Sequence, residues 1–260
     1  MTPTVSPSVV VAIPAYNEAD GIVDFVREVD RVLGPLADPL TLVVVDDAST
    51  DDTVERLAAL APELSAHLEV IRQPHNQGHG PTVLAAYRRA LELEPQYVLQ
   101  VDGDGQFAGS DLRRVLVLLM DEAHAVCGVR RFRHDPWFRM AMTRLLRVYV
   151  RSAFGVIARD ANCPLRGYEA PLLGELLANL PQPCLIPNLY LTVIASRRGL
   201  ALLEVDVSHR VRRGQSAAGS TWGAGRSPVP WRLVRFSTAA LAESRRLRAE
   251  LRAPQKSGER

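Results

Sequence analysis

The chain has 260 residues, enough for one large domain or two small ones, and its apolar (47%) and charged (23%) fractions are those of an ordinary globular protein. No stretch approaches the ~20 apolar residues of a membrane span, and residues 1–7 lack the apolar centre of a signal peptide, so we expect a disordered lead there. The net charge of +2 is too small to indicate a partner by itself.

Four short apolar runs are typical of buried strands: residues 9–13, 40–45, 68–72 and 97–101. Residues 22–33 and 81–93 carry apolar side chains at helical spacing. A shorter helix between them ends near Leu60, with Ser49 or Asp51 as its cap. Strands that alternate with helices predict an α/β fold with a mainly parallel central sheet and helices on both faces.

The fourth strand ends at two carboxylates, Asp102 and Asp104, in residues 97–106 (YVLQVDGDGQ). Gly103 between them lets a ligand come close to the backbone. The carboxylates and the amide oxygen of Gln106 are hard ligands suited to Mg²⁺ or Mn²⁺. Open α/β sheets also bind ligands at the carboxyl ends of their strands. Taken alone, however, the stretch is more simply a strand followed by an Asp/Gly turn.

The other strand ends carry polar loops as well: residues 14–18 (PAYNE), 46–52 (DDASTDD) and 75–80 (HNQGHG). Four such loops at one edge are the layout of a nucleotide site. Neither GxGxxG nor GxxxxGK[ST] occurs, so neither a dinucleotide fold nor a P-loop kinase is indicated.

In their order and spacing, these motifs resemble family 2 glycosyltransferases of the GT-A fold, and most of all the polyprenyl-phosphate sugar synthases. The resemblance extends through residues 128–130 (GVR), 159–166 (RDANCPLR) and 204–207 (EVDV), then His209, Arg212, Gly214 and Ser216. It covers about residues 8–220. It implies a Rossmann-like GT-A domain over residues 8–225. No transmembrane helix is expected, because no apolar stretch is long enough to span a membrane.

The resemblance also implies a metal-dependent, inverting transfer of a hexose from a nucleotide diphosphate sugar of the GDP-mannose or UDP-glucose type. Asp104 and Gln106 would bind Mg²⁺ or Mn²⁺, and Asp102 would bind it directly or orient a metal-bound water and the ribose. The donor would be bound by Pro14, Ala15, Tyr16, Glu18, Asp46, Asp47, Asp102 and Gly103. For Asp46 and Asp47 a helix-capping loop of solvated acids is the alternative.

Arginine matches phosphate geometry with a planar fork. Arg130, directly after the fifth strand, is expected beside the metal site as a catalytic residue with Asp102 and Asp104, holding the acceptor or donor phosphate. Arg144 is a second phosphate candidate, although it equally fits an ordinary basic stripe on a helix. Arg212 and Ser216 complete the set for an acceptor phosphate.

The expected acceptor is a polyprenyl phosphate. Residues 181–203 contain no Asp or Glu, and Asp160 is one acid that could still reach the site from elsewhere in the fold. A hydroxyl acceptor needs a general base, whereas a phosphate is already an anion at neutral pH. The alternatives are the same chemistry on a soluble hydroxyl acceptor, and a non-catalytic domain that binds a nucleotide or a partner protein.

Residues 226–260 are expected to form a basic amphipathic helix and tail. Such a helix can lie on an anionic membrane surface or pack on its own domain. The widely spaced Cys127, Cys163 and Cys184 favour reduced thiols in a cytoplasmic protein, peripheral at the inner face of the membrane if the helix binds there. The arginines lack a recognisable nucleic-acid motif, so no nucleic acid is expected as a partner.

Overall fold

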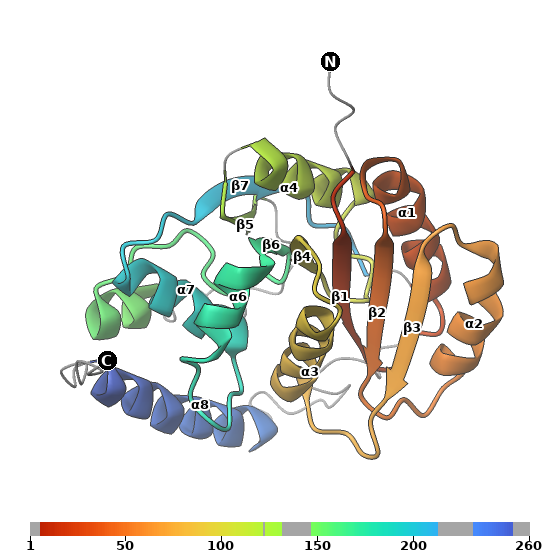
Figure 1. Ribbon diagram of the computed structural model, residues 1–260. Helices are drawn as coiled ribbons and strands as arrows, with labels where there is room; N and C mark the ends of the chain where they lie inside the picture. Colours follow the sequence, from red (N-terminus) through yellow and green to blue (C-terminus); the bar gives the residue numbers. More distant parts are fainter. Residues whose placement is uncertain (1–5, 122, 132–146, 213–230, 252–260) are drawn as a thin grey trace.

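The computed structural model describes residues 6–121, 123–131, 147–212 and 231–251. Its centre is a seven-stranded sheet in the order β3-β2-β1-β4-β6-β5-β7 (Figure 1). The strands are β1 Val9–Ala15, β2 Leu40–Asp46, β3 His67–Arg72, β4 Tyr97–Gln100, β5 Ala125–Arg130, β6 Arg166–Glu169 and β7 Leu203–Val207. The predicted α/β fold with a mainly parallel sheet is confirmed.

One strand departs from that parallel pattern. β6 lies antiparallel between β4 and β5, whereas β1, β2, β3 and β4 pair in parallel, as do β5 and β7. The sequence resemblance extends through residues 159–166, and β6 begins at the last of them, Arg166. This strand brings the turn before it against β5, beside Arg130.

The helices cover both faces of the sheet (Figure 1). They are α1 Ile22–Leu33, α2 Thr53–Leu60, α3 His79–Glu92, α4 Gly109–Asp121, α6 Ala170–Leu177, α7 Pro187–Arg197 and α8 Trp231–Glu250, with 3-10 turns at Gly34–Leu36 and Ala61–Glu63 and further helical residues at 147–154. In α1 the buried residues are Ile22, Phe25, Val26, Val29 and Leu33, as their helical spacing predicted.

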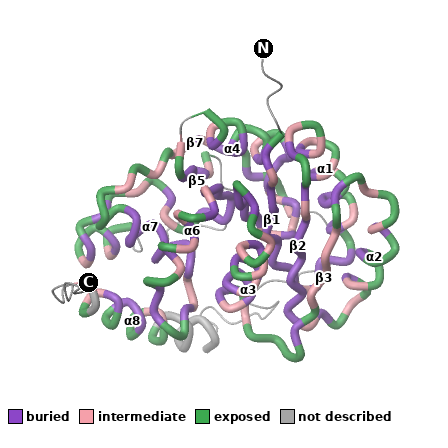
Figure 2. The backbone as a smooth tube through the Cα atoms, viewed as in Figure 1, coloured by how far each residue is buried: buried purple, intermediate pink, exposed green. Residues whose placement is uncertain are grey.

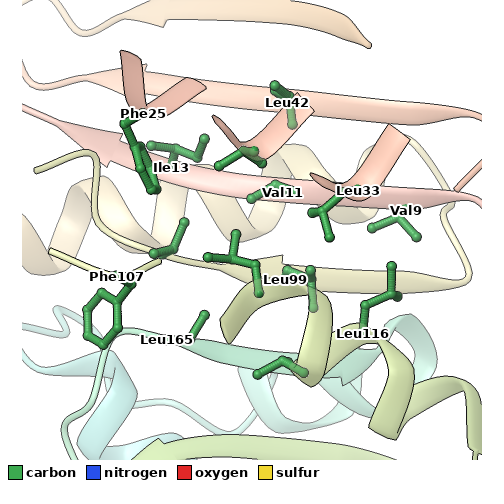
Figure 3. Close-up of a cluster of buried hydrophobic side chains, with 14 of the residues drawn as sticks. Val9, Val11, Ile13, Phe25, Leu33, Leu42, Leu99, Phe107, Leu116 and Leu165 are labelled. Atoms are coloured by element: carbon green, nitrogen blue, oxygen red, sulfur yellow. The ribbon is translucent and has the colours of Figure 1, made fainter. Parts of the chain in front are cut away.

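Alternating side chains of β1 separate two hydrophobic cores, because successive residues of a strand point to opposite faces. Val9, Val11 and Ile13 pack with α1, α2 and α4 (Figure 3). Val10 and Ala12 pack on the other side with α3, α6 and α7. Figure 2 shows the resulting buried sheet between more exposed helices. The layers hold the carboxyl ends of the parallel strands at one edge.

Hydrogen bonds continue past the strand ends and join the loops that follow. The N–H of Asp47 donates to Ala15 O at 2.9 Å, and the N–H of Gly103 donates to Pro14 O at 3.1 Å. A Cβ at Gly103 would lie 2.8 Å from Ile22 Cδ1, so a larger residue at this position would require the Ile22 side chain to shift. The loops after β1, β2 and β4 therefore converge on one place.

The C-terminal helix α8 packs on the rest of the chain, one of the two arrangements that the sequence left open. Leu247 is 1% exposed and joins the core that contains α7. Ser244 Oγ accepts a hydrogen bond from the Tyr149 hydroxyl at 2.9 Å. In the part of the chain that the structure describes, no helix has both the length and the apolar character that a membrane crossing requires. Cys127, Cys163 and Cys184 are buried free thiols, as expected.

Candidate donor and metal site

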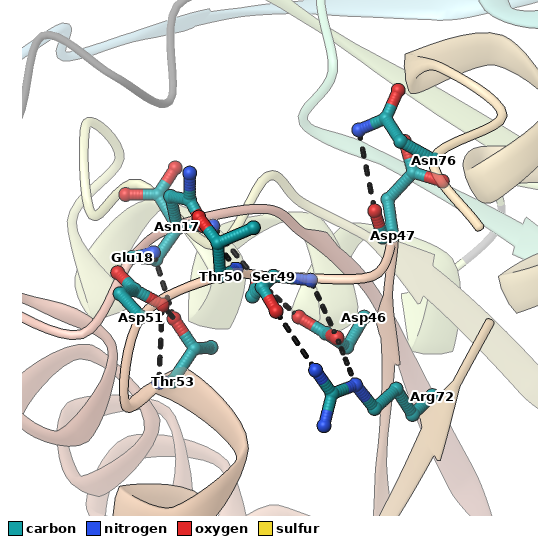
Figure 4. A network of polar contacts seen from close by, with 10 residues as sticks. All are labelled: Asn17, Glu18, Asp46, Asp47, Ser49, Thr50, Asp51, Thr53, Arg72 and Asn76. Atoms are coloured by element: carbon teal, nitrogen blue, oxygen red, sulfur yellow. Dashed lines mark hydrogen bonds and ion pairs between the residues drawn. The ribbon is translucent and has the colours of Figure 1, made fainter. Parts of the chain in front are cut away.

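Hydrogen bonds join the loop after β1 to the loop after β2 (Figure 4). The N–H of Asn17 donates to Ser49 Oγ at 2.8 Å, and the N–H of Glu18 donates to Thr53 Oγ1 at 2.9 Å. In return, Asn17 Oδ1 accepts the N–H of Thr50 at 2.8 Å. Asn17 has a φ of 53°, a left-handed conformation that asparagine tolerates better than most residues. These side chains fix the shape of the predicted donor loop.

Asp46 and Asp47 are buried, so the alternative of solvated acids is wrong. Asp46 accepts both the N–H of Ser49, at 3.0 Å, and the Ser49 hydroxyl. Asp47 accepts the N–H groups of Gln77 and Gly78 at 2.7 and 2.8 Å, and so joins the loop after β2 to the start of α3. Both aspartates organise the loops at the ends of β2 and β3. Their predicted contacts with a nucleoside stay predictions.

The cap of α2 was left open between Ser49 and Asp51. Asp51 Oδ1 accepts the N–H of Thr53, the first residue of the helix, at 3.1 Å. Ser49 instead joins Asp46 and Asn17. The N-cap residue is Asp52, which makes no side-chain cap hydrogen bond, so neither predicted residue occupies the cap position, although Asp51 accepts the N–H of Thr53 from one residue earlier.

Each of the two candidate metal-binding carboxylates accepts a hydrogen bond through one of its two oxygens. Asp102 Oδ1 accepts from Gln100 Nε2 at 3.1 Å, and Asp104 Oδ1 accepts the N–H of Gln106 at 3.0 Å. Among the described residues, no hydrogen bond reaches the other oxygen of either carboxylate. Burial and the neighbouring charge of Asp102 raise the pKa of Asp104 to about 6. A cation beside both carboxylates would relieve this repulsion.

This donor set fits Mg²⁺ or Mn²⁺. Within the described ranges, no group of three or more His, Cys, Asp and Glu side chains is arranged as a complete metal cage. Mg²⁺ in phosphate-transfer sites is commonly held by one or two carboxylates together with water and substrate phosphates. Asp102 and Asp104 supply that number of carboxylates, and a nucleotide diphosphate would supply the remaining oxygens.

Gln106, the third predicted metal ligand, contacts the segment that follows β7. Its Nε2 donates to Arg210 O at 3.3 Å, and its own carbonyl accepts the N–H of Arg210 at 2.7 Å. Arg210 in turn lies 3.3 Å from Glu28. This pairing places residues 208–212 against the carboxylate loop. Metal binding by Gln106 stays a prediction.

Arg212 reaches the donor loop from that segment. Its guanidinium forms an ion pair with the buried Glu18, including a contact of 3.2 Å from Nε. The pKa of Glu18 is raised to about 8, mainly by burial. The charges of Asp104 and Asp102 also raise this pKa, whereas Arg212 lowers it. One arginine therefore lies among three acids at this edge of the sheet.

Arg130 is paired with Asp160. Its Nε and Nη2 lie 2.7 and 3.0 Å from the two carboxylate oxygens, in a bidentate arrangement. Asp160 is 5% exposed, and both of its oxygens are engaged. The pair joins β5 to the turn before β6. A phosphate-binding role for Arg130 stays a prediction, while Arg144 and Ser216 lie outside the described residues.

Sequence reasoning missed a group of polar side chains behind the site. Gln100 ends β4 and is fully buried, and Asn188, in the first turn of α7, is 3% exposed. Each is a polar residue inside an otherwise apolar stretch, VLQV and PNLYL. A buried amide in such a position needs partners. That requirement is the signal that could have singled them out.

Comparisons with known proteins agree with this geometry. The model of the family described as "Glycosyl transferase family 2" matches residues 10–168. Undecaprenyl-phosphate 4-deoxy-4-formamido-L-arabinose transferase of Enterobacter sp. (strain 638) is 26% identical over 203 residues, which are 78% of this chain and 59% of that protein. The protein of the same name from Serratia proteamaculans (strain 568) is 25% identical over 78% of this chain and 60% of its own length.

The chain thus spans about three fifths of the length of these curated relatives. Among solved structures, glucosyl-3-phosphoglycerate synthase from Mycobacterium tuberculosis, in complex with Mn²⁺, uridine diphosphate and glucosyl-3-phosphoglycerate, superposes with a TM-score of 0.64. The two are 19% identical, and the match covers 94% of this chain and 80% of the other. This likeness shows the GT-A fold. Since the family model covers well over half of the sequence, the chain belongs to glycosyl transferase family 2.

Proposed function

We propose that the protein transfers a hexose, with inversion, from a nucleotide diphosphate sugar to a polyprenyl phosphate. The observation that carries the proposal is the meeting of Asp102 and Asp104 with the Glu18–Arg212 pair at the strand ends. The undecaprenyl-phosphate substrate in the names of the curated relatives supports the acceptor class. UDP bound in the structural relative makes UDP-glucose the first donor to test, with GDP-mannose beside it.

The nucleoside would be enclosed by the loops after β1 and β2. Pro14, Ala15 and the half-buried Tyr16 line one side of it, and Asp46 and Asp47 hold the other. Gly103 lets the carboxylate loop lie directly against Pro14 and Ala15 of this donor loop, so the carboxylates would lie next to the nucleoside. Glu18, held at the site by Arg212, borders the region of the diphosphate.

Asp102 and Asp104 would hold the divalent cation, which when bound neutralises the charge of the departing nucleotide diphosphate. Arg212 adds a fixed positive charge on the same side, because its guanidinium already lies against Glu18. An incoming phosphate would compete with Glu18 for that guanidinium. The cation and Arg212 together would therefore supply the positive charge that faces the phosphates.

The acceptor needs no general base if it is a phosphate. Residues 181–203 offer no acid, and Asp160, the alternative base, uses both oxygens to hold Arg130. This arrangement favours an acceptor that is already ionised. Arg130, Arg144, Arg212 and Ser216 remain the residues proposed to bind it.

Membrane association is proposed through the exposed side of α8. Arg245, Arg246 and Leu241 are exposed there, while Leu247 is turned into the core. The described part of α8 would thus pack on the rest of the chain and still present basic side chains to an anionic surface.

The test is a radiolabelled transfer assay. UDP-glucose and GDP-mannose are each offered with a short polyprenyl phosphate, with a neutral alcohol, or with no acceptor. We expect one of the two donors to label the polyprenyl phosphate. This labelled product should be absent with the Asp104→Asn variant and in the presence of a chelator. Labelled alcohol alone would indicate the soluble-acceptor function. Nucleotide binding without any transfer or hydrolysis would indicate a non-catalytic domain.

A further inference from the structure

A buried row of hydrogen bonds runs from Asp102 into the protein interior. Gln100 Nε2 donates to Asp102 Oδ1 at 3.1 Å, and Gln100 Oε1 accepts from Asn188 Nδ2 at 3.0 Å. Asn188 Oδ1 accepts from the Tyr87 hydroxyl at 3.1 Å. Gln100 and Tyr87 are 0% exposed and Asn188 is 3% exposed. Three elements, β4, α7 and α3, each contribute one member.

The carboxylate fixes the direction of the whole row. An ionised carboxylate only accepts, so Gln100 must turn its NH₂ group toward Asp102 and its oxygen toward Asn188. Asn188 must then turn its own NH₂ group toward Gln100 and its oxygen toward Tyr87. Each donor points toward Asp102, and aligned hydrogen bonds polarise and strengthen one another.

A buried positive charge lies beyond the far end of this row. The rings of Tyr87 and Tyr168 meet edge to face, with centroids 6.3 Å apart. Arg166 Nη1 donates to the Tyr168 hydroxyl at 3.2 Å, and the arginine is 0% exposed. The row thus lies between the Asp102 carboxylate and the Arg166 guanidinium.

Apolar side chains could fill the same space without needing hydrogen-bond partners. Buried polar groups, in contrast, stabilise a core only when all of them are satisfied. The row ends on one of the two carboxylates proposed to hold the cation, and it occupies one oxygen of that carboxylate. We propose that Gln100 and Asn188 are positioning residues, which hold Asp102 so that its second oxygen faces the cation and the donor diphosphate. This inference rests on the proposed function.

The competing explanation is that the row serves only the stability of the core. A double-mutant cycle separates the two explanations. Gln100→Met removes the group that touches Asp102, and Asn188→Leu removes the group that orients Gln100, each at similar size. If Asn188 acts through Gln100, the double variant binds the cation no more weakly than Gln100→Met alone. If the two substitutions damaged the structure independently, their losses of cation affinity would add in the double variant.

The measurement is the binding of Mn²⁺, followed by the loss of the electron paramagnetic resonance signal of free aqueous Mn²⁺, with UDP and separately with GDP present. We expect each single variant to weaken Mn²⁺ binding about 10–100-fold, as is usual when a partner of a metal ligand is removed. Tyr190→Phe is the matched control. Tyr190 lies on the same helix as Asn188, and the substitution removes a hydrogen bond from its hydroxyl to Ala240 O, away from the row. It should bind Mn²⁺ as the native protein does. Thermal denaturation reports the stability of every variant.

Tyr87→Phe keeps the test decisive if Asn188→Leu does not fold, because it removes only the outermost hydroxyl and should weaken Mn²⁺ binding in the same direction. Native-like Mn²⁺ affinity in folded Gln100→Met, or additive losses in the cycle, would overturn the positioning role. A native protein that binds no Mn²⁺ with either nucleotide would overturn the proposed function and this role with it. Coupled losses in a protein that glycosylates no lipid phosphate would leave the role intact and refute only the proposed acceptor.

Discussion

Replacing Arg130 with alanine should destabilise the fold, whatever its effect on transfer. The change leaves the Asp160 carboxylate without its bidentate partner, and the two side chains are only 16% and 4% exposed. Removing one partner of a buried ion pair typically costs about 3–5 kcal/mol. For a chain of this size each kcal/mol lowers the melting temperature by about 2–4 °C. We therefore expect the melting temperature of Arg130→Ala to fall by about 10 °C.

Calorimetry or circular dichroism on four proteins measures the pair itself: native, Arg130→Ala, Asp160→Ala and the double variant. The double variant should be more stable than the sum of the two single losses predicts, by about 2 kcal/mol, because both charges of the buried pair are then removed together. Arg130→Lys keeps a charge but loses the fork, so its stability should fall between native and Arg130→Ala. It is also the variant in which a phosphate-binding role can be tested, as an increase in the acceptor KM at an unchanged donor KM.

An unchanged melting temperature in Arg130→Ala would refute this account of the pair. Strictly additive losses in the cycle would do the same. Either result would mean that Arg130 is free to serve a phosphate without cost to the fold.

The remaining predictions concern the cation, the carboxylate loop and the membrane. Asp104→Ala should abolish Mn²⁺-dependent nucleotide binding in titration calorimetry, while a variant that still binds would remove Asp104 from the site. The pKa of Asp104 is raised to about 6, so protons compete with the cation below that pH. The affinity for Mn²⁺ at pH 5 should therefore be about tenfold lower than at pH 7. An affinity that does not change between these pH values would contradict this prediction. Gly103→Ala should lower stability by about 1–3 kcal/mol in thermal denaturation, since its Cβ would meet Ile22 Cδ1 at 2.8 Å, and native stability would show that the loop can move aside. Arg245→Gln should weaken pelleting with anionic liposomes about fivefold, from ~1 kcal/mol per basic residue, and equal pelleting would remove this face of α8 from membrane binding.

Local patterns were enough to predict most of the sheet and its first helices. The spacing of Ile22, Phe25, Val26, Val29 and Leu33 already defined the buried face of α1, because a helix repeats every 3.6 residues. The loops after β1, β2 and β4 were placed at one edge because parallel strands share their direction. These inferences depend only on neighbours in sequence.

Long-range pairing could not be predicted in this way. Arg130 was expected to be available for a phosphate, yet a carboxylate 30 residues later holds it. Arg212 meets Glu18 across 194 residues, and Gln106 meets the backbone of Arg210 across 104. Such contacts depend on how the antiparallel β6 and the segment after β7 fold back, and no periodicity of the sequence encodes them.

Transfer from a labelled nucleotide sugar to a short polyprenyl phosphate, measured between about pH 6.5 and 8, tests the central claim most directly. We expect glycosylated lipid phosphate, a rate that varies little across this range because the acceptor needs no general base, and no product in the presence of a chelator. An inert lipid phosphate, together with hexose transfer to a neutral hydroxyl acceptor and a bell-shaped pH profile, would contradict it.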